Sequence, residues 1–241
     1  MSSKRRAAKR ADNNVIEIHR QNDRNLVLGS IKPKTLNQEK AFKAFADGKH
    51  LMLAGSAGCG KTLISMYLGL REVDKGLFNK IVVVRSAVPT RSQGFLPGSL
   101  KEKAKVFEAP FMGVCNDDLY HRGDAYDVLK LKNKIEFITT SYLRGITLSN
   151  CVIVVDEAAS MTFHELDSII TRVGQNCRII IMGDCRQSDL QKGFEKQGFR
   201  DFIKVAKMMG SFELIEFTHA DILRSDVVRE FLIARDNLGI E

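Results

Sequence analysis

Apolar and polar positions alternate along the chain in blocks, with short runs of β-branched residues separated by longer segments of helical period. Six apolar runs predict strands, at residues 51–54, 81–84, 135–139, 151–155, 178–182 and 213–217. Segments of helical period lie at 62–73, 99–108, 163–173, 197–208 and 226–235. The strands are continuously apolar, which indicates burial on both faces. The pattern predicts an α/β fold, with a mostly parallel sheet and helices on both faces.

The positive charge is concentrated ahead of the first strand. Residues 1–34 contain nine Lys and Arg against three Asp and Glu, so they hold most of the net charge of +8. We therefore expect a basic N-terminal arm and lead-in over 1–34 and one domain over 35–241. The basic run at 4–10 can contact nucleic-acid phosphates, or it can be a solvated tail. Without a membrane-length apolar stretch or a signal peptide, we expect a cytoplasmic protein with no membrane contact.

The first strand leads into a glycine-rich loop. The loop consists of Gly55, Ser56, Ala57, Gly58, Cys59, Gly60, Lys61 and Thr62. It fits the pattern GxxxxGK[ST] between a strand and a helix, in which backbone N–H groups surround phosphate oxygens. In that pattern Lys61 reaches the β- and γ-phosphates and Thr62 ligates Mg²⁺. The loop therefore predicts a site for a nucleoside triphosphate.

Two later strands end in polar residues, at the sheet edge where ligands bind in such folds. Asp156 and Glu157 follow strand 151–155. We expect Asp156 to hold Mg²⁺ and Glu157 to orient and deprotonate water. Asp184 and Gln187 follow strand 178–182, and an amide near the γ-phosphate can sense its loss. An ordinary polar turn is the alternative for this second pair.

Three further residues are candidates on weaker patterns. The amide of Gln38 can read the edge of adenine, although an isolated Gln is more typical of an exposed helix residue. Arg172 and Arg224 are candidate arginine fingers, for the nucleotide of their own or of a neighbouring subunit. Most arginines on helices are instead solvated or ion-paired.

Other nucleotide chemistries can be weighed on the same sequence. Guanine recognition by NKxD is unsupported, because the Asn-Lys pairs at 79–80 and 133–134 lack the following Asp. Small-molecule kinases usually have a basic lid, and residues 85–105 are basic. A phosphotransferase therefore remains an alternative to an ATP hydrolase. A slow nucleotide-dependent regulatory or assembly module is a third class.

These pieces, in this order, resemble the PhoH family of P-loop ATPases, which is related to the motor domains of superfamily 1 helicases. The resemblance covers about 35 to 235 and is carried by RSAVPTRSQGFLPGSLKEK (85–103), TTSYLRGITLSNCVIVVDEAA (139–159) and GDCRQSDL (183–190). It implies a single RecA-like domain that binds ATP, hydrolyses it with Mg²⁺, and has a link to RNA or single-stranded DNA. It also implies an adenine-side role for Gln38, phosphate sensing by Asp184 and Gln187, and an arginine-finger role for Arg224.

The chain departs from the family pattern at two positions. Ser86 stands where the family commonly has Pro, and Ala159 stands where it usually has Gln. The alanine lacks an amide that could couple hydrolysis to nucleic acid. A single lobe would also have to form a ring, borrow a partner or not translocate, so we expect a homo-oligomer, with a hexamer as the ring size suggested by the fold. The expected catalytic residues are Lys61, Glu157, Gln187 and Arg224.

Overall fold

The computed structural model describes residues 26–86, 100–143, 145–184 and 198–239, and side chains from residue 106 onward in the second of these ranges. The basic run at 4–10, Gln187 and most of segment 85–105 lie outside the described residues. Among the described helices, none combines the length and the apolar character needed to cross a membrane.

Within the described residues, six strands form one sheet. They are β1 (His50–Ala54), β2 (Lys80–Arg85), β3 (Ile135–Thr139), β4 (Cys151–Val155), β5 (Cys177–Gly183) and β6 (Phe212–Glu216). Their order is β3-β2-β4-β5-β1-β6, and every ladder between them is parallel. All six predicted strands are therefore confirmed. A parallel order needs a crossover between strands, which the intervening helices supply.

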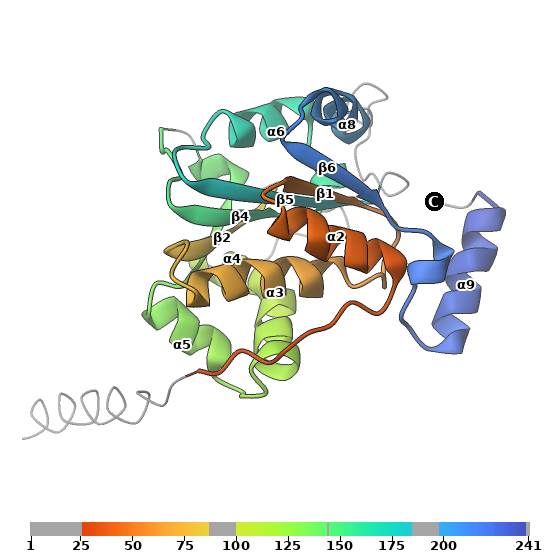
Figure 1. Cartoon of the computed structure of the whole chain (residues 1–241), viewed down its shortest axis with the longest axis horizontal. Coiled ribbons are helices and arrows are strands. Elements are labelled where there is room, and N and C mark those ends of the chain that lie inside the picture. The colour runs from red at the N-terminus through yellow and green to blue at the C-terminus, as the bar shows by residue number, and fades with distance from the viewer. Residues whose placement is uncertain (1–25, 87–99, 144, 185–197, 240–241) are drawn as a thin grey trace, which may run out of the picture.

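Helices cover both faces of this sheet (Figure 1). They are α2 (Leu36–Ala46), α3 (Lys61–Asp74), α4 (Leu100–Gly113), α5 (Ala125–Leu131), α6 (Phe163–Ile170), α8 (Gly198–Met208) and α9 (Asp226–Asn237). Helices α2 to α5 lie on one face and α6 and α8 on the other, while α9 lies beside the end of the sheet. The arrangement is the predicted α/β fold, with a parallel sheet and helices on both of its faces (Figure 1).

The core has two halves, one on each face of the sheet. Leu51 and Leu53 of β1 belong to the cluster under α3, and Met52 between them belongs to the cluster under α6 and α8. Every residue of β4 is buried. This burial on both faces explains why the strands are apolar without alternation.

Several helices differ from the sequence prediction. Helix α4 continues through Pro110 and is followed by a π-helix at Val114–Leu119. Helix α6 ends at Ile170, and its first turn is fixed by a capping box between Thr162 and Glu165. Helix α5 was not predicted, since its seven residues are too short for a clear period.

The lead-in from residue 26 packs on the domain. Leu26, Leu28 and Ile31 contact the core cluster on the α3 face. The backbone N–H of Gly29 donates to the carbonyl of Leu119 at 2.7 Å. This segment then reaches Thr35, whose hydroxyl caps α2. The division at residue 34 stays a prediction, but residues 30–34 form one wall of the site described next.

Candidate active site

The glycine loop joins the carboxyl end of β1 to the first turn of α3. Gly58 and Gly60 have φ of 89° and 78°, a region that L side chains rarely adopt. A Cβ on Gly58 would lie 2.8 Å from Cγ of Arg224, so the loop also leaves no room there. The N-cap of α3 is Gly60, which provides no side-chain cap to the first turn. Backbone N–H groups of that turn are therefore positioned to bind an anion.

Neighbouring segments hold the loop at its first residue and at its middle. The N–H of Gly55 donates to the carbonyl of Gly183 at the end of β5, at 3.1 Å. The N–H of Leu223 donates to the carbonyl of Gly58 at 3.0 Å. Lys61 folds back over the loop, and its Nζ donates to the carbonyls of Gly55 at 2.8 Å and Ser56 at 2.7 Å. A bound phosphate would offer this ammonium a charged acceptor in place of two neutral ones.

The acid pair follows β4 at the same edge of the sheet. The N–H of Asp156 donates to the carbonyl of Val84 at 3.0 Å, which extends the β2–β4 ladder. Glu157 has a positive φ of 52°, an uncommon conformation for a non-glycine residue and one that concentrates at functional sites. Burial raises the pKa of Asp156 to about 6; the adjacent Glu157 charge adds to the rise and the Arg85 charge opposes it. A divalent cation would favour the charged carboxylate.

Arg85, the last residue of β2, lies against this pair. Its Nε is 3.5 Å from Oδ2 of Asp156, and its Nη2 contacts Oε1 of Glu157. On the other side it faces α4, with Nη1 donating to the carbonyl of Phe107 at 3.5 Å and the guanidinium 5.5 Å from the Phe107 ring centre. The sequence prediction did not include Arg85 as a site residue. Only the pairing of strands reveals this residue: Val84 and Val155 are register partners, so Arg85 and Asp156, which follow them, lie side by side.

Gln38 lies against the loop and is buried, in contrast to the exposed position typical of an isolated Gln on a helix. Its Nε2 donates to the carbonyl of Cys59 at 3.1 Å, and its Oε1 accepts from the N–H of Lys34 at 2.8 Å. One N–H and one lone pair of the amide remain for a ligand. The adenine-reading role stays a prediction.

The two arginine candidates lie at opposite ends of the sheet. Arg224 lies over Gly58 of its own chain. The carbonyl of Arg172 instead accepts from the N–H of Leu148, ahead of the amino end of β4. In the described chain, therefore, Arg224 is beside the loop and Arg172 is at the far edge from it.

These groups surround one cleft of about 1290 Å³. Its lining includes Gln38, Ala57, Gly58, Gly60, Lys61, Thr62, Arg85, Asp156, Glu157, Asp184 and Arg224. The donor set fits a magnesium-bound triphosphate: glycine N–H groups and Lys61 for phosphate oxygens, and the hydroxyl of Thr62 with the carboxylate of Asp156 for a hard cation that prefers oxygen ligands. The structure thus brings together the predicted residues that it describes, apart from Arg172.

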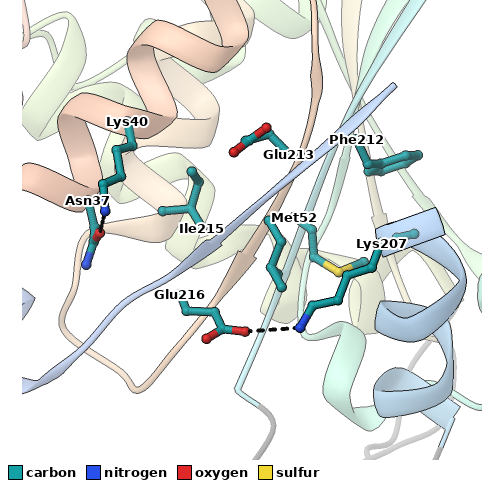
Figure 2. Close-up of a pocket in the computed structure, with 10 residues that line it drawn as sticks. Asn37, Lys40, Met52, Lys207, Phe212, Glu213, Ile215 and Glu216 are labelled. Carbon is teal, nitrogen blue, oxygen red and sulfur yellow. Dashed lines mark hydrogen bonds and ion pairs between the residues drawn. The ribbon is translucent and has the colours of Figure 1, made fainter. Parts of the chain in front are cut away.

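A second hollow, of about 590 Å³, lies along β6 between α2 and α8 (Figure 2). Met52, Phe212 and Ile215 line it together with Lys207 and Glu216, whose Nζ and Oε1 are 3.7 Å apart. None of the residues predicted for the nucleotide lines this groove. The chemistry of the loop and acid pair belongs to the larger cleft.

A glycine loop between strand and helix, facing an acid pair across the carboxyl edge of a parallel sheet, defines a P-loop NTPase. The family model of the PhoH-like proteins matches residues 30–235. The chain belongs to this family.

Curated relatives agree with this assignment. The chain is 32% identical to a PhoH-like protein of Bacillus subtilis over 208 residues, which cover 86% of this chain and 64% of that one. It is 31% identical over 208 residues to a PhoH-like protein of Mycobacterium tuberculosis, covering 85% and 58%. Among solved structures, the Pif1 helicase from Candida albicans is similar with a TM-score of 0.42 and 17% identity, covering 87% of this chain and 44% of that one. The chain spans less than two thirds of the length of these relatives.

Proposed function

We propose that this protein is a Mg²⁺-dependent ATPase that acts on RNA or single-stranded DNA. The observation that supports hydrolysis is the shared cleft, in which Lys61, Thr62, Asp156 and Glu157 converge. Phosphoryl transfer depends mainly on positioning and on charge stabilisation, and these four side chains are of the types that supply both.

Each residue has a proposed role. Residues 55–62 bind the triphosphate, and Thr62 with Asp156 holds Mg²⁺. Glu157 orients the attacking water and accepts its proton. Asp184, beside the loop through the bond between Gly55 and Gly183, senses the γ-phosphate. Gln187 has the same proposed role but lies outside the described residues.

Arg224 is proposed to stabilise transition-state charge within its own chain, since it lies over Gly58. Such an arginine is worth about 10³–10⁵ in rate where it acts. The link to nucleic acid is proposed from family membership and from the basic N-terminal run. We also propose that the protein is cytoplasmic and forms a homo-oligomer, with a hexameric ring as the proposed assembly.

The test is Mg²⁺-ATP hydrolysis with and without single-stranded RNA and DNA. Lys61→Ala is the control for a contaminating ATPase. Glu157→Gln keeps the shape of the side chain but cannot accept the proton, so turnover should fall by at least about 100-fold while a fluorescent ATP analogue still binds. Unchanged turnover in Glu157→Gln would eliminate the proposed base. Stimulation by RNA or by DNA would identify the nucleic acid on which the protein acts. Hydrolysis that depends on Lys61 but responds to neither polymer would refute the proposed action on nucleic acid and leave the proposed ATPase activity standing.

A further inference from the structure

Arg85 has contacts that the proposed catalytic roles leave unexplained. Its side chain is only 13% exposed, and it lies between the acid pair and α4. Its guanidinium contacts Oδ2 of Asp156 and Oε1 of Glu157. These are the carboxylates proposed to hold the cation and to activate water.

The guanidinium occupies the position of a counter-ion. Two adjacent carboxylates at the end of a buried strand repel each other, and burial increases that repulsion because water screens it less. One planar guanidinium can pair with both, since its N–H groups project in several fixed directions. With Arg85 in place, one of the two negative charges of the pair is balanced without a metal ion.

We propose that Arg85 is a positioning residue that substitutes for the divalent cation while the nucleotide site is empty. It holds Asp156 in place and occupies Oε1 of Glu157, an oxygen that would otherwise be available to water. Arrival of Mg²⁺ with the triphosphate then displaces the guanidinium from the pair. The face of Phe107 and its carbonyl offer Arg85 contacts that do not depend on the acids.

This inference rests on the proposed cation site, and it predicts how the nucleotide-free protein responds to Mg²⁺. While Arg85 occupies an oxygen of each acid and balances one of their two charges, Mg²⁺ alone should bind weakly and leave the melting temperature unchanged. In Arg85→Gln the acids lose their counter-ion, so Mg²⁺ should bind them and stabilise the fold. At a concentration ten times its dissociation constant, the cation should raise Tm by about 3–6 °C.

The experiment is a set of thermal melts in EDTA and in increasing MgCl₂, without nucleotide. Arg85→Gln should gain the Mg²⁺-dependent rise, and Arg85→Gln with Asp156→Asn should lose it again. Arg85→Lys retains the charge but not the planar guanidinium, so it should give an intermediate rise in Tm. It replaces the glutamine variant in the test if that variant does not fold. Lys80→Gln is the matched control, since it removes a cation from the other end of β2, where Lys80 pairs with Glu136.

The outcomes separate this inference from the proposed function. A Mg²⁺ response in the wild type equal to that of Arg85→Gln would overturn it, and so would no response in either arginine variant. A merely structural arginine would lower Tm equally with and without Mg²⁺, which also refutes the inference. No nucleotide is present, so an absence of ATPase activity would leave these melts interpretable and would refute only the proposed reaction.

Discussion

Replacing Gln38 tests how the lead-in and the phosphate loop support each other. The side chain is 4% exposed and makes two internal hydrogen bonds, from the Lys34 N–H and to the Cys59 carbonyl. Gln38→Met keeps most of the volume but removes both bonds. Each bond contributes about 0.5–1.5 kcal/mol, and the Cys59 carbonyl would stay buried without this partner, so we expect a loss of about 2–3 kcal/mol.

The loss should be visible in unfolding and in binding. For a chain of this size it corresponds to a fall in Tm of about 4–12 °C. Lys40→Gln, on the exposed side of α2, is the control and should change stability by less than about 0.5 kcal/mol. A Gln38→Met protein as stable as the wild type would refute the reasoning that this amide joins the lead-in to the loop.

The same variant tests adenine recognition separately. If the remaining N–H and lone pair of Gln38 read adenine, the preference for ATP over GTP should fall by about 1–3 kcal/mol, the discrimination of one bidentate contact. Titration with fluorescent ATP and GTP analogues measures that ratio. Equal weakening of both nucleotides would leave Gln38 with a structural role only.

Two further predictions concern the loop and the sheet. Gly58→Ala should lose about 1–2 kcal/mol of folding stability through its positive φ, and it should bind the ATP analogue less tightly because the new Cβ meets Arg224. Gly123→Ala is the control and should show neither effect, since no atom lies near its Cβ. A Gly58→Ala protein with the urea midpoint and the affinity of the wild type would contradict the proposed role of the loop in phosphate binding. Burial, aided by the charge of Arg178, lowers the pKa of His50 below its ordinary 6.5. The unfolded chain then binds a proton that the folded chain resists, so stability should fall as pH drops below about 6.5. His50→Gln should reduce that fall in urea melts, and an identical pH slope in both proteins would contradict it.

Local patterns were sufficient for the strands and the loop. The six strands are continuous apolar runs, and residues 55–62 need only their own spacing and the flanking strand and helix to be recognised. Asp156 and Glu157 were predictable for a similar reason, because the carboxyl ends of parallel strands meet at one edge. Each of these features can be recognised from one short segment of consecutive residues.

The missing parts depend on contacts between distant segments. Arg85 meets the acid pair only because β2 is the neighbour of β4, and strand order has no local signal. Gln38 lies against the phosphate loop, where its amide donates to the carbonyl of Cys59, 21 residues away in the sequence. The π-helix at Val114–Leu119 follows a helix that continues through Pro110, where the sequence pattern predicted an earlier end.

The position of β1 in the sheet has a consequence for synthesis of the protein. The strand that begins the phosphate loop pairs with β5 and β6, which the ribosome makes more than a hundred residues later. Strands β2, β3 and β4 can pair with one another first, while the apolar β1 waits without either neighbour. Such distant pairings are slow and leave apolar surface exposed in the nascent chain. The proposed nucleotide site is therefore complete only after Arg224 has emerged.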